Sequence, residues 1–444
     1  MIKHHYKNLI IGFGKGGKTL AAYFASQQEE VAIIEKSPRM YGGTCINIGC
    51  IPSKSLITNA DAGMPYKTSH EIKENLVTDL RKKNYKKLAD THYATIIDGE
   101  ASFISPTKVK VHMAQQEIIL TADRIFINTG ASPSIPDIKG INGKNIYNST
   151  TLMDIRERPA HLTIVGGGFI GLEFADMFLK FGSKVTLLES AAVFLPHEDS
   201  DVADAIHGHL IKNGLQLITE ATVVQFDTQT NQTIVTYKKD QLEENFPTDA
   251  VLIATGRTPE TKGLNLEAAG IATDDQGYIK VNDRLQTTAE NIWALGDVNG
   301  SPQFTYISLD DFRIIKNQLS GGPYNSTDKR RLYPTAVFLS LPYAHIGLNE
   351  KTATEKGLHF KTFRIKAAVI PKAAILQQKD GILKAIVDIQ TGKILGCTLF
   401  CAEAHELINI VQLAMNNALS YKILRDNIYT HPSMAESFND LFSE

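Results

Sequence analysis

The sequence predicts an α/β protein made of two doubly wound units and a separate C-terminal α+β domain. The first observation is an internal repeat, because an apolar strand, a glycine-rich turn, an apolar helix and a second apolar strand occur near the start and again after residue 160. The second is spacing, since in each copy a glutamate lies 23 positions after the first glycine: Glu35 after Gly12, and Glu189 after Gly166. From about Tyr333 onward the pattern changes to short apolar strands and one helix.

The two turns have the G-x-G-x-x-G pattern of a Rossmann-type unit. The glycines are Gly12, Gly14 and Gly17 in the first copy and Gly166, Gly168 and Gly171 in the second. The first glycine makes a tight turn, the second lets a pyrophosphate approach the backbone, and the third packs the helix against the strand. The glutamate accepts hydrogen bonds from ribose hydroxyls. One such turn is weak support, but two complete βαβ units predict that the chain binds two dinucleotides.

Other apolar strands suggest the domain limits. Two of them end in Thr-Gly, at Gly130 and Gly256, and a third ends in Gly-Asp at Asp297. In the C-terminal part, strands are expected at 336–338, 367–370 and 382–387, with a helix at about 405–417. We expect the first dinucleotide-binding domain at 1–150 and 276–332, the second at 151–275, and the α+β domain at 333–444. The lysine-rich stretch 81–87 is interpreted as the solvated face of a helix.

The composition narrows the functional class. The chain has 444 residues, with 46 Lys+Arg against 48 Asp+Glu and a formal net charge of −2. We therefore expect no nucleic-acid partner, and no apolar run approaches the ~18–20 residues of a membrane span. The N-terminus lacks the pattern of a signal peptide, and four cysteines cannot form a secreted disulfide framework. A cytoplasmic, multi-domain enzyme is expected.

Two of the four cysteines, Cys45 and Cys50, lie five residues apart in a glycine-flanked segment that continues to Lys54. Such a pair can reach disulfide geometry across a slightly distorted helical turn. A position near a helix start would lower the pKa of a thiol and favour redox use. A zinc site would need two more ligands, which Cys397 and Cys401 could supply only if they lay close to this loop. We interpret those two as buried structural thiols and expect no metal.

The Gly-Gly-Thr-Cys45-x4-Cys50-x3-Lys54 segment resembles the active site of the class I pyridine nucleotide–disulfide oxidoreductases, which have a glutathione-reductase-like fold. The resemblance covers essentially the whole chain, up to a final His431-Pro-Ser-Met-Ala-Glu436. It implies FAD in the first domain, NAD(H) in the second and dimerisation by the third. The FAD-binding residues it implies are Gly12, Gly14, Gly17, Glu35, Lys54, Gly130 and Asp297. The NAD-binding residues it implies are Gly166, Gly168, Phe169, Gly171, Glu189 and Gly256.

The resemblance also implies roles in catalysis. Cys50 would lie against the flavin as its charge-transfer partner, and Cys45 would face the substrate as the interchange thiol. Lys54 would lie near the flavin and pair with Glu173. Phe169 would cover the nicotinamide pocket.

An acid/base dyad of His431 and Glu436, donated by the second subunit, completes the implied active site and implies an obligate homodimer. The segment 304–311, Phe-Thr-Tyr-Ile-Ser-Leu-Asp-Asp, resembles the reactive-chlorine-resistance (hypothiocyanous acid reductase) flavoproteins of this family. Glu189 is followed by five residues without Arg or Lys to neutralise a 2′-phosphate, so NADH is expected over NADPH. The expected activity is an FAD-dependent NADH oxidoreductase that reduces hypothiocyanous acid or a related small-molecule oxidant and contributes to oxidative stress defence.

Several alternatives stay open. Dihydrolipoamide dehydrogenase shares the cysteine pair and the His–Glu pattern, although the acid that often follows Pro342 is replaced here by Tyr343. Reduction of Cu(II) or Hg(II) is a further alternative, although the vicinal cysteines typical of mercuric reductases are missing from the C-terminal residues. Glutathione reductases usually carry basic residues for their substrate, which are not found in the expected places. A non-catalytic redox sensor is disfavoured because Cys45, Cys50 and His431 are all present.

Overall fold

The computed structural model describes residues 2–230 and 232–443. Its contacts divide the chain into two units, each assembled from three stretches. The first unit consists of Met1–Ser55, His70–Ser134 and Gly256–Arg330. The second consists of Leu56–Ser69, Ile135–Thr255 and Arg331–Glu444. The four-part division expected from the sequence stays a prediction.

The first unit is built on a seven-stranded sheet in the order β3-β2-β1-β6-β5-β4, with β17 beside β6. The strands are β1 His5–Ile11, β2 Val31–Glu35, β3 Ala94–Asp98, β4 Glu100–Ser105, β5 Lys108–His112, β6 Glu117–Ile127 and β17 Ile292–Ala294. A two-stranded ribbon pairs β7 Ala131–Pro133 with β16 Arg257–Pro259. The helices are α1 Lys15–Ser26, α2 Thr44–Asn47, α3 Cys50–Asp61, α4 Tyr66–Ala89 and α8 Thr305–Ser320, of which α3 and α4 extend into the other unit.

The strands β3, β2, β1, β6 and β17 pair in parallel, as the repeat of strand, turn and helix requires. Strand β1 is buried from Asn8 to Ile11, and α1 turns Leu20 and Phe24 toward the core. The carboxyl ends of β1 and β2 therefore lie next to each other. This places the first glycine-rich turn beside Glu35.

The second unit repeats the arrangement in a five-stranded parallel sheet, β11-β10-β9-β15-β8. The strands are β8 Ile146–Asn148, β9 His161–Val165, β10 Lys184–Leu188, β11 Leu215–Ile218 and β15 Ala250–Ile253. An antiparallel sheet is formed by β12 Thr222–Thr228, β13 Thr233–Lys239 and β14 Leu242–Thr248. The helices of this part are α5 Ser149–Leu152, α6 Phe169–Lys180 and α7 Ser200–Lys212.

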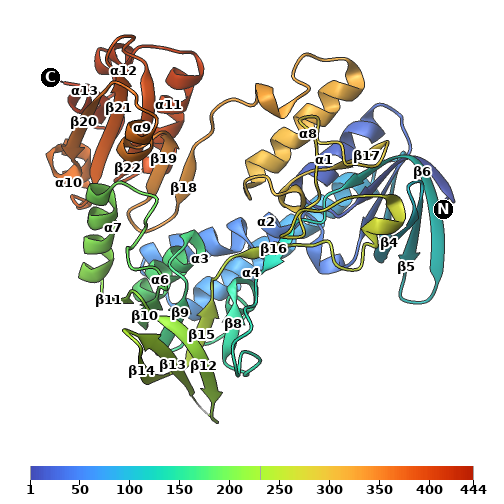
Figure 1. Cartoon of the computed structure of the whole chain (residues 1–444), viewed down its shortest axis with the longest axis horizontal. Coiled ribbons are helices and arrows are strands. Elements are labelled where there is room, and N and C mark those ends of the chain that lie inside the picture. The colour runs from blue at the N-terminus through green and yellow to red at the C-terminus, as the bar shows by residue number, and fades with distance from the viewer. Residues whose placement is uncertain (1, 231, 444) are drawn as a thin grey trace. The chain divides into compact units, whose positions relative to one another are not determined.

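The C-terminal part of the second unit has an antiparallel sheet, β18-β19-β22-β21-β20, which is drawn in orange and red in Figure 1. The strands are β18 Thr335–Val337, β19 Tyr343–Gly347, β20 Phe360–Lys366, β21 Ile382–Asp388 and β22 Ile394–Phe400. The helices are α9 Glu350–Glu355, α10 Pro371–Ile375, α11 Ala404–Asn416, α12 Tyr421–Arg425 and α13 Ser437–Leu441. Helix α11 packs on β19 and β22. The predicted α+β segment and α/β class are confirmed.

One predicted strand is wrong. Residues 367–370 form a short 3₁₀ turn, Ala367–Val369, and not a strand. The preceding strand β20 already pairs with β21 up to Lys366. Pro371 then begins α10, and a proline favours the first turn of a helix. The apolar run is buried in a helical corner, which periodicity alone does not distinguish from a short strand.

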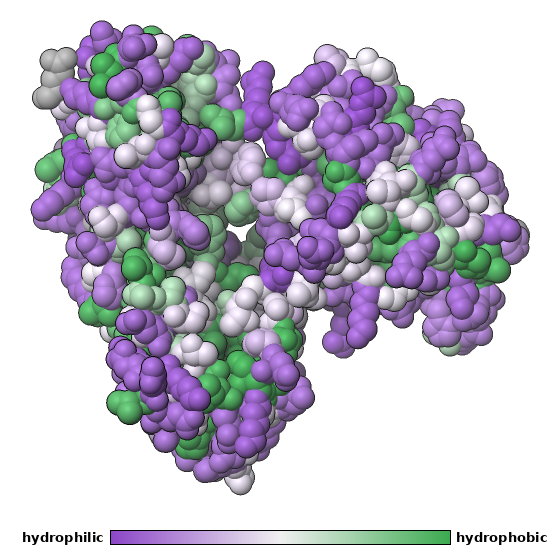
Figure 2. Space-filling view, in the orientation of Figure 1, coloured by the Kyte–Doolittle hydropathy of each residue, from purple (hydrophilic) through white to green (hydrophobic). Residues whose placement is uncertain are grey.

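Within the described residues, no helix has the length and apolar character needed to cross a membrane. Figure 2 shows a face that is mostly hydrophilic, with hydrophobic side chains in small groups.

Candidate active site

The first glycine-rich turn and Glu35 form one hydrogen-bonded unit. The backbone N–H of Phe13 donates to Glu35 Oε2 at 3.0 Å, and the N–H of Ser37 donates to Oε1 at 3.2 Å. Burial raises the pKa of Glu35, although these N–H donors oppose the shift. Gly12 has a φ of +102°, and a Cβ there would lie 2.4 Å from the carbonyl oxygen of Asn128. Only glycine fits this turn.

The second turn has the same geometry around Glu189. The N–H of Gly167 donates to Glu189 Oε2 at 2.8 Å, and the N–H of Ala191 donates to Oε1 at 2.8 Å. In both copies the glutamate therefore accepts two backbone N–H groups. One belongs to the residue after the first glycine, and the other belongs to the residue two positions after the glutamate. Gly166 has a φ of +106°, which matches Gly12. The repeat in the sequence is a repeat in hydrogen bonding.

The starts of α1 and α6 suit a phosphate ligand. Both helices begin after an extended glycine, Gly14 or Gly168. In α1 the N–H groups of Gly16 and Gly17 already donate to Ser308 Oγ at 3.1 Å and to Asn128 Oδ1 at 2.8 Å, whereas among the described residues no side chain accepts the first N–H groups of α6. The first backbone N–H groups of a helix need acceptors, and a pyrophosphate provides them. A Cβ at Gly168 would meet nothing within 4 Å among the described residues, so packing does not require glycine there. Close approach of a ligand does explain it, and the residues present fit a dinucleotide in both units.

The two Thr-Gly strand ends meet in the first unit. The N–H of Ser134 donates to the Gly256 carbonyl at 2.9 Å, and the N–H of Glu260 donates to the Gly130 carbonyl at 2.9 Å. Asp297 follows β17 and is half-buried, and burial raises the pKa of its carboxyl while Arg257 opposes the shift. The strand ends thus bring Gly130, Gly256 and Asp297 into the same unit as the first glycine-rich turn.

The thiol pair lies where two short helices begin. Cys45 is in α2 and half-buried, Cys50 is the first residue of α3 and exposed, and both are in the thiol form. Cys50 Sγ lies 3.7 Å from the hydroxyl oxygen of Thr305, the first residue of α8. The hydrogen bond with Cys50 and burial both raise the pKa of Cys45, while Thr305 and Lys18 act in the opposite direction. For Cys45 in this dithiol form, the hydrogen bond with Cys50 and burial thus outweigh the groups that lower its pKa.

The segment that carries Cys45 is held by residues that the sequence did not single out. Lys18 Nζ donates to the Gly42 carbonyl at 3.1 Å and to Asn84 Oδ1 at 2.6 Å. Arg81 Nε donates to Asn47 Oδ1 at 2.8 Å. The lysine-rich helix stretch is therefore solvated only in part, because Arg81 and Asn84 turn toward the redox segment. Nothing local in the sequence marks these contacts, which join three separate elements.

The remaining residues expected near the two cofactors are distributed between the units. Lys54 lies in the first unit and Glu173 in the second, so their pairing stays a prediction. Glu173 is buried on α6, and one of its carboxylate oxygens accepts the N–H of Phe338 at 3.0 Å. Phe169 begins α6 and is 40% exposed. It lines a small pocket with Leu195 and other residues of the second unit.

The His–Glu pair in the C-terminal segment is formed. His431 Nδ1 lies 2.8 Å from Glu436 Oε2, and the other carboxylate oxygen accepts the N–H of Ser433 at 3.3 Å. The imidazole is 69% exposed whereas the carboxylate is 16% exposed. The acid is thus held by the fold and orients an outward-facing imidazole.

Cys397 and Cys401 are buried in the core of the C-terminal sheet, at 1% and 0% exposure. Burial raises the pKa of both thiols, so both act as small apolar side chains.

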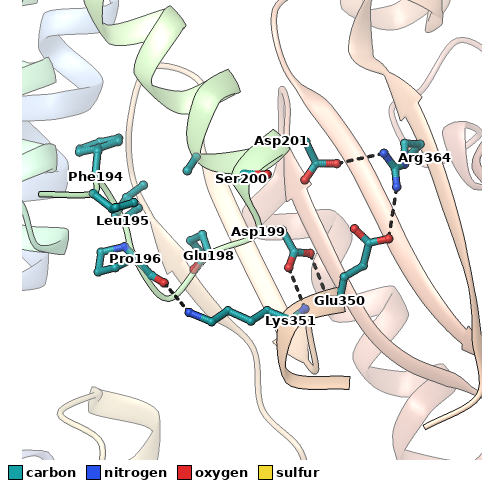
Figure 3. A pocket seen from close by; sticks show the side chains of 12 residues that line it. Phe194, Leu195, Pro196, Glu198, Asp199, Ser200, Asp201, Glu350, Lys351 and Arg364 are labelled. Atoms are coloured by element: carbon teal, nitrogen blue, oxygen red, sulfur yellow. Dashed lines mark hydrogen bonds and ion pairs between the residues drawn. The ribbon is translucent and has the colours of Figure 1, made fainter. Parts of the chain in front are cut away.

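A cavity of about 470 Å³ lies between the start of α7 and the strands of the C-terminal sheet. Figure 3 shows Asp199, Asp201 and Glu350 converging there beside Arg364. The three carboxylates surround Lys384, whose Nζ is 2.9, 2.8 and 2.5 Å from Asp199, Asp201 and Glu350. This set, the Lys384 cluster, already has its counter-charge. It lies outside the predicted site.

The comparisons with known proteins agree with this geometry. The family model "Pyridine nucleotide-disulphide oxidoreductase" matches residues 6–311, and the dimerisation domain of the same family matches residues 333–442. The chain belongs to the pyridine nucleotide–disulphide oxidoreductase family. It is an oxidoreductase, and membership of this family implies FAD and a nicotinamide coenzyme.

Several family members are similar over the whole chain. A probable pyridine nucleotide-disulfide oxidoreductase of Escherichia coli, RclA, is 47% identical over 99% of both chains. The mercuric reductase of Lysinibacillus sphaericus is 32% identical, covering 97% of this chain and 81% of that one. A solved structure described as the Cu(II) complex of the HOCl-induced flavoprotein disulfide reductase RclA from Escherichia coli has a TM-score of 0.96 at 46% identity, covering 100% of this chain and 99% of that chain. The predicted family is confirmed.

Proposed function

We propose that this protein is an FAD-dependent NADH oxidoreductase that uses Cys45 and Cys50 to reduce hypothiocyanous acid or related reactive chlorine and thiol oxidants. The observation that carries the proposal is the thiol pair, in which Cys45 is hydrogen-bonded to Cys50 and Cys50 lies beside Thr305. The choice of oxidant is supported by the 47% identity to RclA, whose solved structures are described as those of an HOCl-induced disulfide reductase.

The two thiols do different work in the proposed oxidation. The Cys45 thiolate attacks the oxidant sulfur, so that a new S–S bond forms, the S–O bond breaks, and the oxygen leaves as water after taking a proton. The Cys50 thiolate then attacks the Cys45 sulfur and thiocyanate leaves with the bonding electrons. Two thiols are oxidised to one disulfide, and the oxidant is reduced by the same two electrons. Bound FAD supplies the two-electron link between the nicotinamide and this disulfide.

The remaining residues of the proposed site bind the two dinucleotides and orient a proton-carrying group. Glu35 and Glu189 each hold their glycine-rich turn and would accept ribose hydroxyls, with NADH favoured over NADPH at the second turn. His431, oriented by Glu436, would hold or donate a proton beside the thiols of a second subunit in a homodimer. The dimerisation-domain match supports that assembly.

The proposal is tested with purified holoenzyme and NADH by following coenzyme oxidation with hypothiocyanous acid, lipoamide, glutathione disulfide and metal ions. Hypothiocyanous acid should give the highest kcat/KM, and Cys45→Ser and Cys50→Ser should each abolish turnover. Brisk oxidation of dihydrolipoamide with NAD, alongside feeble use of hypothiocyanous acid, would overturn the proposal in favour of a dihydrolipoamide dehydrogenase.

A second candidate is the reduction of metal ions. It is favoured by the solved relative described as a Cu(II) complex and by the mercuric reductases at 32% identity. In the same assay, turnover with Cu(II) or Hg(II) that exceeds turnover with hypothiocyanous acid would favour this function.

A further inference from the structure

We propose that Lys18 is a positioning residue of the thiol centre. Its ammonium, held between the Gly42 carbonyl and the Asn84 side chain, anchors the segment that carries Cys45 and supplies the positive charge under which Cys45 becomes a thiolate. The inference rests on the proposed function only in taking Cys45 as the reacting thiol.

The geometry places Lys18 between three elements. It lies in the first helical turn of α1, next to Gly17, which is the last glycine of the first glycine-rich segment. Its Nζ reaches Gly42, which precedes α2, and Asn84 in the C-terminal part of α4. Ordering a lysine side chain costs up to ~2 kcal/mol of rotamer entropy. Two hydrogen bonds and partial burial act against this cost and hold the Lys18 side chain in one place.

The segment itself needs such an anchor. Gly42 and Gly43 have φ values of +103° and +79°, a backbone that other residues rarely adopt. A Cβ on Gly43 would come within 2.6 Å of Gly14 Cα, so the redox segment lies directly on the first glycine-rich turn. The Lys18 contact to the Gly42 carbonyl therefore fixes the backbone three residues before Cys45.

The groups around Cys45 support the second part of the proposal, that the Lys18 charge stabilises the Cys45 thiolate. The groups with the largest effects on the pKa of its thiol are Cys50 on α3, Thr305 on α8 and Lys18 on α1, and Lys18 is the cation among these three. Burial, together with the charges of Lys15 and Lys87, lowers the pKa of Lys18 to about 8, while Cys45 acts to raise it. Lys18 is therefore protonated near neutral pH and becomes neutral as the pH rises past about 8.

This behaviour gives a test that does not depend on any oxidant. In holoenzyme carrying Cys50→Ser, the rate of Cys45 alkylation by iodoacetamide is measured from pH 5 to pH 10. The other two thiols are fully buried and should not react in the native protein. The variants compared are Lys18→Met, Lys18→Gln and Lys18→Arg. Lys87→Met is the control, because Lys87 is an exposed lysine with a small effect on Lys18 and is not among the groups with the largest effects on Cys45.

Lys18→Met and Lys18→Gln should each raise the apparent pKa of Cys45 by about one unit, which is about tenfold slower alkylation at pH 7. The difference from the parent should shrink above about pH 8, where Lys18 itself is neutral. Lys18→Arg should restore most of the rate, and Lys87→Met should leave the profile within ~0.3 unit of the parent.

An unchanged profile in Lys18→Gln, whose amide keeps the hydrogen-bonding capacity without the charge, would overturn the proposal even if Lys18→Met failed to fold. Failure of Lys18→Arg to restore the rate would also overturn it. Neither result depends on which oxidant the enzyme reduces, so failure of the proposed function remains distinguishable.

Discussion

Removal of the Lys384 ammonium is expected to destabilise the second unit strongly. Lys384 is 2% exposed and Asp199 is 7% exposed, so this pair at 2.9 Å is buried. Asp201 and Glu350 also contact the ammonium but are 29% and 30% exposed. In Lys384→Met, three carboxylates lose their common counter-ion inside a cavity wall.

The expected loss of stability in Lys384→Met follows from these contacts. Breaking a buried ion pair by removing one partner costs ~3–5 kcal/mol, because the other charge stays buried and unpaired. The lower end applies here, since Asp199 keeps two backbone N–H donors, from Glu350 at 3.0 Å and Lys351 at 3.1 Å. Arg364 also remains beside the two half-exposed acids. At ~2–4 °C per kcal/mol for a unit of this size, a loss of ~3 kcal/mol lowers Tm by ~6–12 °C.

The assay is thermal unfolding of the holoenzyme at one scan rate, because unfolding of a cofactor-binding multi-domain protein is not two-state. Arg364→Met is the matched control. Arg364 also contacts Asp201 and Glu350, but its side chain is 53% exposed. Exposed ion pairs contribute ~0–1 kcal/mol, so its Tm should fall by less than ~4 °C.

The pH dependence of the stability that the Lys384 cluster contributes gives a second test of this reasoning. Burial alone would raise the pKa values of Asp199 and Glu350, but hydrogen bonds, those from Lys384 above all, outweigh it and lower both. Carboxyls with lowered pKa stabilise the fold above their unfolded pKa of ~4, and this stability is lost as the pH falls through the folded pKa. Burial likewise acts to lower the pKa of Lys384, yet its hydrogen bonds to acids raise it, so its contribution persists until about pH 10.

The Tm difference between the parent and Lys384→Met should therefore be constant from about pH 5 to pH 9 and shrink below about pH 4. A decrease no larger than that of Arg364→Met, or a difference that persists undiminished at pH 3, would refute the reasoning.

Four further outcomes are expected. The parent should use NADH at least ~10-fold more efficiently than NADPH, a difference of ~1.4 kcal/mol, and Glu189→Gln should narrow this ratio; equal kcat/KM values in the parent would contradict it. Purified Cys45→Ser should show long-wavelength absorbance without added NADH, and Cys50→Ser should not; the opposite pattern would reverse the assignment of the two thiols. His431→Ala should slow lipoamide reduction by ~10²-fold or more and hypothiocyanous acid reduction far less, because that oxidant is already electrophilic; equal losses in parallel assays would argue against the dyad's role. Gly168→Ala should leave Tm within ~2 °C while raising the KM for NADH, since its Cβ meets only open space; an unchanged KM would count against ligand approach at that glycine.

The fold was predictable where the physical constraint is local. The distance from first glycine to acid reflects a strand, a turn, a helix and a second strand of nearly constant length, so Glu35 and Glu189 could both be assigned from spacing. The boundaries of α11 also follow from its pattern, with 405–417 expected and Ala404–Asn416 found. The 367–370 prediction failed because four apolar residues fit a buried strand and a buried helical corner equally well.

The candidate site was predictable only in part, because several of its contacts join elements far apart in the chain. Asn128 shows the difficulty. Its side chain accepts the Gly17 N–H at 2.8 Å and donates to the Leu295 carbonyl at 2.6 Å, which ties the glycine-rich turn to the residue that follows β17. In the sequence it is one polar residue in an apolar strand. Lys18 and Asn84 are similarly ordinary helix residues until α1 and α4 are packed around the redox segment.

The two glycine-rich turns share their hydrogen bonds but differ in how firmly protein surrounds them. Glu35 is 7% exposed, and a Cβ on Gly14 would lie 2.5 Å from Asn128 Oδ1, so protein atoms already crowd the first turn. Glu189 is only half-buried, and the corresponding position at Gly168 opens on empty space. Binding a ligand in the enclosed turn slows its release, whereas an open turn lets a ligand enter and leave. Under the proposed function, the enclosed turn would hold the flavin, which stays bound through many turnovers, and the open turn would hold the nicotinamide coenzyme, which must exchange in each one. The same sequence motif thus has different surroundings in its two copies, because the residues that pack around it differ.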